Sequence, residues 1–163
     1  MFAVITQHWK PQCWPQAWPK LSEACGKFFF VLGETGAKLQ TYIAGHPSLR
    51  NRVMFVNQDE GKPAAAFRIV NEPKKDWAYI QYLVRSGYYV RTRADADTVE
   101  ARKGDWSRWQ AALISGAQII STDYYVPDPR LKTGYFVNLS AERPAVGIPF
   151  CCPRNARYLR RSS

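Results

Sequence analysis

The stretch YYVRTRADADT, residues 88–98, begins as an apolar strand and ends in charged residues. Its first part, YYVRTRA (88–94), is rich in aromatic and β-branched residues and follows a glycine, which is typical of a strand. The same change from apolar to polar occurs in GAQIISTDYY (116–125), where AQIIST (117–122) predicts a second strand. Both segments indicate core strands that end at a polar edge of a sheet.

Two more strands are predicted upstream, at KFFFVLG (27–33) and RVMFVNQ (52–58). Each is a continuous apolar run that is too short for an ordinary helix, which indicates a strand buried on both faces. Helical patterns separate the strands; they lie at 17–27, 35–49, 62–73, 74–87 and about 105–113. Strands that alternate with helices predict right-handed βαβ crossovers and a parallel α/β sheet.

The chain has 163 residues, of which 46% are hydrophobic, enough for one domain with a real core. Its formal net charge of +10 favours an anionic partner such as phosphate, an acidic lipid surface or nucleic acid. Part of this charge lies near the C-terminus, in a segment without apolar periodicity. We therefore divide the chain into an irregular segment (1–16), a folded domain (17–139) and a basic tail (140–163).

Location and thiol chemistry are not readable from the sequence. There is no long apolar run typical of a membrane span and no secretory signal pattern, so the compartment is left open. The four cysteines, Cys13, Cys25, Cys151 and Cys152, lack metal-ligand spacing, and their disulfide state is also left open.

Several segments resemble one family, the calcium-dependent phosphoinositide-specific phospholipase C type of phosphodiesterase. The resemblance covers about residues 17–139, and its most specific strings are VRTRADADT and GAQIISTDYY. It implies part of a TIM barrel with about four βα units, corresponding to the C-terminal half, with the N-terminal half of the barrel missing. The chain is then a fragment of a phosphoric diester hydrolase of lipid metabolism.

The resemblance also implies what this chain lacks. In the family, the first barrel strands supply catalytic histidines and calcium ligands, so we predict no catalytic residue, no metal ligand and no calcium bound by this chain alone. His46 follows a helix and precedes a strand, which places it on the face opposite the catalytic loops and predicts a structural role. His8 lies in a segment that matches nothing in the family. The chain alone is therefore expected to be inactive.

Polar residues at the predicted carboxyl ends of the strands are the candidates for substrate binding, because parallel α/β sheets carry their sites there. They are Asn57, Arg91, Arg93, Asp123 and Tyr124. Arg91 and Arg93 project to one side of their strand, where two guanidinium groups could bind a phosphate. The alternative for both arginines is an internal ion pair with Asp123 or Asp95.

The same segment contains a further pattern, in which Asp95, Asp97 and Thr98 alternate with small residues. This spacing resembles the start of a calcium loop, but the glycine and distant glutamate of an EF-hand are absent. A helix N-cap at Asp97 or Thr98 is favoured instead. For Asp123, we expect a role in orienting an arginine.

The partner expected from these residues is a phosphate-containing small molecule or a phosphoinositide head group, with a membrane surface as a further candidate. No RNA-binding signature accompanies the charge, so nucleic acid is not expected. The apolar edge strands at 27–33 and 117–122 predict pairing with a second copy or with the missing half of the barrel. A noncatalytic module that binds an anion or a lipid head group is the alternative function.

Overall fold

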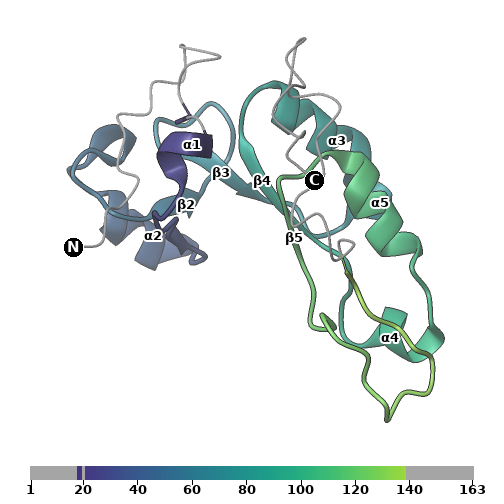
Figure 1. The fold of residues 1–163 in the computed structure, drawn as a ribbon. Coiled ribbons are helices and arrows are strands. Elements are labelled where there is room, and N and C mark those ends of the chain that lie inside the picture. Colours follow the sequence, from purple (N-terminus) through teal and green to yellow (C-terminus); the bar gives the residue numbers. More distant parts are fainter. Residues whose placement is uncertain (1–17, 20, 139–163) are drawn as a thin grey trace. The chain divides into compact units, whose positions relative to one another are not determined.

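The computed structural model describes residues 18, 19 and 21–138, and it divides the chain into two compact units. Within the described residues, the first unit comprises the chain up to Ile69 together with Gly87–Tyr89. The second comprises Val70–Ser86 and the chain from Val90 onward (Figure 1). The predicted segments 1–16 and 140–163, with His8, Cys13, Cys151 and Cys152, lie outside the described residues.

The strands are β1 (Val31–Leu32), β2 (Phe55–Asn57), β3 (Ala65–Ile69), β4 (Tyr89–Arg93) and β5 (Ile119–Ser121). In the first unit, β2 pairs in parallel with both β1 and β3. In the second unit, β4 pairs in parallel with β5, and the Val70 N–H donates to the Arg91 carbonyl at 3.0 Å. The chain is thus an α/β protein with parallel strands, which confirms the prediction of a partial α/β barrel.

The helices are α1 (Leu21–Ala24), α2 (Gly36–Ile43), α3 (Pro73–Arg85), α4 (Val99–Lys103) and α5 (Ser107–Ser115), with a 3₁₀ turn at Pro47–Leu49. The predicted helices correspond to α1, α2, α3 and α5. Gly26 and Gly45 follow α1 and α2 with positive φ, as expected of glycines that end helices. None of the helices in the described part of the chain is long and apolar enough to cross a membrane.

The helix predicted at 62–73 is wrong, because this segment contains strand β3. Its alanines favour a helix by propensity, but Ala65, Ala66 and Phe67 are almost completely buried, which a half-exposed helix would not allow. The side chain of Asn57 accepts a hydrogen bond from the Ile69 N–H at 3.0 Å, where the β2–β3 register shifts. Tertiary burial and pairing with β2 therefore override the local propensity.

The first unit is held together by aromatic packing. Phe29 stacks on Phe55 with ring centroids 4.6 Å apart. The ring centroid of Trp18 lies 5.3 Å from that of Tyr89 and 5.4 Å from that of Phe55. The Trp18 indole also donates to the Gly87 carbonyl at 2.9 Å. This cluster joins segments that are distant in the sequence.

Not every side chain of the predicted apolar strands is buried. Phe55 is 8% exposed, whereas Phe28 and Phe30 are 50% and 44% exposed and Val53 is 49% exposed. The prediction of a strand buried on both faces is therefore wrong at 27–33, where the regular strand contains only two residues and Phe28 and Phe30 stack on each other at 5.9 Å.

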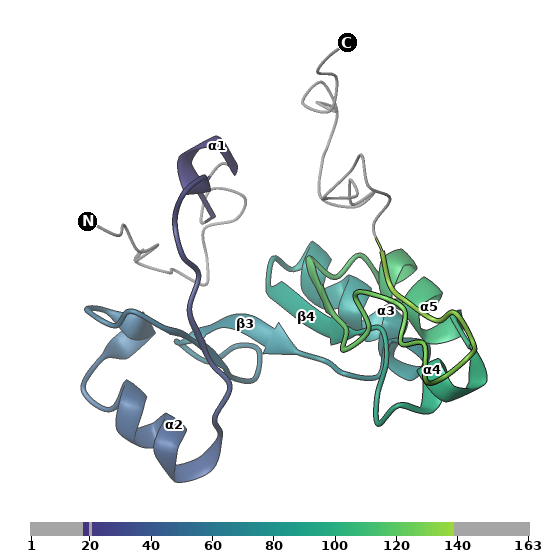
Figure 2. The ribbon, with the colours of Figure 1, turned by 60° about the horizontal axis from the view of Figure 1, so that its bottom comes forward.

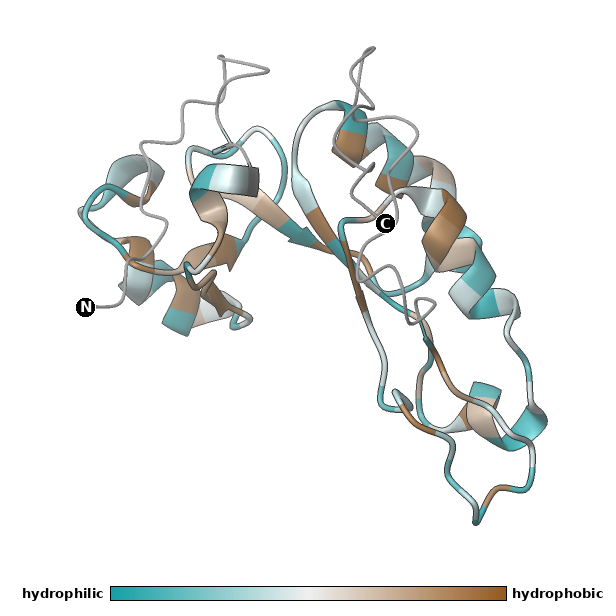
Figure 3. Ribbon diagram, viewed as in Figure 1, coloured by the Kyte–Doolittle hydropathy of each residue, from teal (hydrophilic) through white to brown (hydrophobic). Residues whose placement is uncertain are grey.

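The second unit packs two amphipathic helices beside β4 and β5. Helices α3 and α5 lie side by side in both views (Figures 1 and 2), and each carries hydrophobic and hydrophilic residues (Figure 3). Ile80 and Leu83 of α3 and Val90 of β4 are completely buried. Aliphatic burial therefore positions β4, whose outer residues form the candidate site.

Candidate functional site

The site is built on β4, where burial alternates along the strand. Val90 and Thr92 are completely buried, whereas Arg91 and Arg93 between and after them are only half-buried. Since side chains alternate across a strand, both arginines project to the same side, as predicted. The β4–β5 register sets Arg91 opposite Ile119 and Arg93 opposite Ser121. Arg93 thus lies where both strands end, and Arg91 lies two residues earlier on the same side of β4.

Arg91 is held by two neutral acceptors. One terminal nitrogen donates to Asn71 Oδ1 at 2.8 Å, and the other donates to Ser121 Oγ at 2.5 Å. Burial lowers the pKa of Arg91, and the nearby charge of Arg93 lowers it further, whereas Asp123 partly offsets both effects. The positive charge of Arg91 is therefore oriented but not neutralised by its hydrogen-bond partners.

Among the described residues, Arg93 has fewer hydrogen-bond partners than Arg91. Its Nε is buried and has no hydrogen-bond partner among the described residues. In the same part of the chain, neither Arg91 nor Arg93 forms an ion pair with a carboxylate. The predicted alternative, an internal ion pair with Asp123 or Asp95, is therefore not formed there.

Asp95 is committed to the loop that follows β5. This carboxylate is 3% exposed, and its oxygens accept hydrogen bonds from Thr122 Oγ1 at 2.5 Å and from the Asp123 N–H at 3.0 Å. The Asp123 side chain is exposed, and it acts on Arg91 through its charge, which partly opposes the lowering of the Arg91 pKa. Asp95 therefore fixes the start of this loop, and Asp123 does not hold an arginine directly.

Tyr124 has a packing role in this arrangement. Its ring meets Tyr135 edge-on at 5.7 Å, and its carbonyl accepts a bond from the Val137 N–H at 2.8 Å. Tyr135 is 1% exposed, and its hydroxyl donates to the Ala94 carbonyl at 3.3 Å. Burial raises the pKa of Tyr135, helped by the charge of Asp95.

Two predicted positions belong to the first unit. The Asn57 carboxamide oxygen accepts the Ile69 N–H of β3 at 3.0 Å, so within the first unit this side chain supports the pairing of β2 and β3. His46 Nδ1 lies 2.9 Å from the Arg50 carbonyl, at the turn that follows α2. This local contact agrees with the structural role expected for His46.

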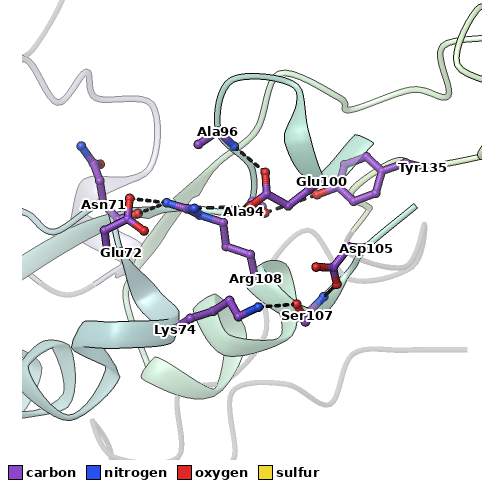
Figure 4. Close-up of polar contacts among 10 residues, drawn as sticks. All are labelled: Asn71, Glu72, Lys74, Ala94, Ala96, Glu100, Asp105, Ser107, Arg108 and Tyr135. Carbon is purple, nitrogen blue, oxygen red and sulfur yellow. Dashed lines mark hydrogen bonds and ion pairs between the residues drawn. The ribbon is translucent and has the colours of Figure 1, made fainter. Parts of the chain in front are cut away.

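A buried ion-pair network supports the arginine site, and sequence reasoning missed it. Figure 4 shows Arg108 between Glu100 on one side and Asn71 with Glu72 on the other. Arg108 is 9% exposed and Glu100 is 7% exposed, and their ion pair measures 3.3 Å. A signal existed, because Arg108 shares a buried helical face with Ala112 and Ser115.

Asn71 and Glu72 were missed for another reason. They follow β3 after one intervening residue, Val70, and the helix expected at 62–73 concealed them as strand-end polar residues. The predicted N-cap is correct in place but not in chemistry, because Thr98 precedes α4 without a side-chain cap bond. Glu100 Oε2 instead accepts the Ala96 N–H at 2.9 Å.

The residues that the structure describes contain no group of three or more His, Cys, Asp or Glu side chains that could hold a metal ion. Calcium takes six to eight oxygen ligands, whereas both oxygens of Asp95 already accept hydrogen bonds. These residues do not fit a calcium site. Cys25, the described cysteine, is exposed and has no disulfide partner in the described part of the chain.

Comparison with protein families gives a match. A family model described as "Phosphoinositide phospholipase C, Ca2+-dependent" matches residues 10–149, which is most of the chain. No curated protein matches the chain, and no solved structure does.

Proposed function

Because the chain belongs to the Ca²⁺-dependent phosphoinositide phospholipase C family, we propose that it binds the phosphate of a phosphoinositide head group through Arg91 and Arg93. The observation that carries this proposal is the pair of arginines on one side of β4, neither of which has a carboxylate partner among the described residues. Arginine suits this ligand, since its planar fork matches two phosphate oxygens at once.

The energetics of burial support the same ligand. A half-buried arginine loses part of its hydration and needs compensation from an anion or from acceptors. Arg91 has two neutral acceptors, and the buried Nε of Arg93 has none within the described residues. Two adjacent guanidinium groups also repel each other, which lowers the pKa of Arg91. A bound phosphate removes this repulsion and supplies the missing acceptors.

We further propose that this chain does not hydrolyse the ester by itself. General acid and base catalysis needs a titrating group within hydrogen-bond reach of the reacting atoms. The sequence has two histidines, of which His46 bonds to the Arg50 carbonyl and His8 lies outside the described residues. Asp95 is occupied by two donors and Asp123 is exposed. The described residues also do not fit calcium, so we assign it no step.

A noncatalytic module that binds an anion or a lipid head group is the second candidate function. It is favoured by the same geometry, in which the arginines are in place but no acid–base pair accompanies them among the residues that the structure describes. Calcium-dependent turnover of phosphatidylinositol by the purified chain would assign it to the enzymes. Binding of the head group that is unchanged by a calcium chelator, without turnover, would assign it to the modules.

Calorimetric titration with inositol 1-phosphate tests the binding proposal. Hydrogen bonds to charged groups contribute about 1.5–3 kcal/mol, so Arg91→Lys or Arg93→Lys should weaken binding about tenfold or more. Lysine keeps the charge but cannot reproduce the fork. Arg68→Lys is the matched control, because Arg68 is already paired with Asp59 and Glu60. Equal affinities for the three variants and the wild type would reject the site.

A further inference from the structure

We propose that Arg108 is a positioning residue for the anion site, acting on Arg91 through Asn71. This inference deepens the proposed function and rests on it. Arg108 holds the backbone of Asn71, and the side chain of the same residue holds Arg91. Two hydrogen bonds thus connect the buried ion pair between α4 and α5 to the guanidinium group on β4.

The first step is the anchoring of Arg108 itself. One terminal nitrogen pairs with Glu100 Oε1 at 3.3 Å, and the other donates to the Asn71 carbonyl at 2.7 Å and to Glu72 Oε1 at 2.5 Å. The guanidinium therefore joins α4, α5 and the segment after β3 (Figure 4). Because two carboxylates neutralise its charge, we do not expect Arg108 itself to bind an external anion.

The second step is the anchoring of Glu100. Its other carboxylate oxygen, Oε2, accepts the Ala96 N–H at 2.9 Å. Ala96 lies in the loop that leaves β4 after Arg93. Glu100 therefore fixes the loop at the end of β4, while Arg108 fixes the segment at the end of β3.

Asn71, held by Arg108, in turn fixes the orientation of Arg91. Asn71 Oδ1 accepts one terminal nitrogen of Arg91 at 2.8 Å, and Ser121 Oγ accepts the other at 2.5 Å. Two fixed nitrogens define the plane of a guanidinium group, so its remaining donors keep a constant direction. A flexible Asn71 would leave Arg91 attached at Ser121 alone, and the fork would rotate. The rigidity of Asn71 comes from Arg108.

The test uses Arg108→Lys, which keeps the charge but cannot span Glu100 and Asn71 together. Two quantities are measured, the affinity for inositol 1-phosphate and the rotation rate of the Arg91 guanidinium, read from its nitrogen NMR signals without ligand. We expect affinity about tenfold weaker and faster rotation. Arg68→Lys is the control, since its side chain is 12% exposed against 11% for Arg108 and it also lies between two carboxylates. It should change neither quantity.

A second variant keeps the test decisive if Arg108→Lys does not fold. Asn71→Ala removes the link at a half-buried position, and it should increase the rotation of Arg91 to a similar extent. When both variants fold, the double variant should bind no more weakly than Asn71→Ala alone, because both changes act on one path. Unchanged rotation of Arg91 in Asn71→Ala, or additive losses in the double variant, would overturn the inference. A wild-type chain that binds no inositol 1-phosphate would refute the proposed function, while the rotation rates still test the positioning.

Discussion

Arg68 in the first unit and Arg91 in the second are both strand arginines, but they have opposite kinds of partner. Arg68 lies 3.0 Å from Asp59 and 3.6 Å from Glu60, so its charge is neutralised locally. Arg91 is bonded to an amide and a hydroxyl, which orient its charge without cancelling it. The partners of an arginine, more than its burial, therefore indicate whether it has a structural role or is a candidate for binding.

The first prediction compares the loss of Arg108, which like Arg68 pairs with two carboxylates, with the loss of Arg91, which bonds to neutral groups. Arg108→Met should lower the free energy of unfolding by about 3–5 kcal/mol, because it leaves the buried Glu100 without its partner. Arg91→Met should cost about 1 kcal/mol, since Asn71 and Ser121 are half-buried and can bond to water. Urea denaturation of the two variants measures both values. Similar losses for both would show that partner type does not separate the two roles.

The second prediction compares the packing of the two units. Leu83→Ala removes a completely buried side chain of α3 and should cost about 2–5 kcal/mol of the free energy of unfolding. Phe28→Ala removes a larger side chain that is 50% exposed, and it should cost less than about 1 kcal/mol. Urea denaturation again gives both values. A loss for Phe28→Ala as large as that for Leu83→Ala would mean that the edge of the first unit is covered in solution.

The third prediction concerns pH and is the smallest effect. Burial raises the pKa of Tyr135, so the folded chain keeps this proton when the unfolded chain has lost it. The protonated Tyr135 therefore contributes its full share to the free energy of unfolding below the ordinary tyrosine pKa of about 10, and this contribution declines as the pH rises above that value. Tyr135→Phe should make the free energy of unfolding less dependent on pH between about 9.5 and 11.

Tyr125→Phe is the control for this prediction, because Tyr125 is 75% exposed. It should leave the pH dependence of unfolding as in the wild type. An identical pH dependence in the wild type and both variants would contradict the burial of the Tyr135 hydroxyl.

The sequence predicted the parts of the site that follow from strand periodicity. In strand 88–94 the charged Arg91 and Arg93 alternate with uncharged residues, so the shared side of the two arginines could be read directly, and β4 and β5 lie where predicted. Asn71 was missed because an alanine-rich segment has high helix propensity and becomes a strand only through pairing with β2. Arg108 was missed because a charged residue on a helix is usually solvated; its place on the helical face of Ala112 and Ser115 was the available signal, and its tertiary partners confirm the burial.

The most direct test of the central claim is a crystal structure of the chain with inositol 1-phosphate bound. We expect the phosphate oxygens to contact the guanidinium groups of Arg91 and Arg93, with Arg91 still bonded to Asn71 and Ser121. A phosphate bound at other basic residues, with both guanidinium groups of β4 free of ligand, would contradict it.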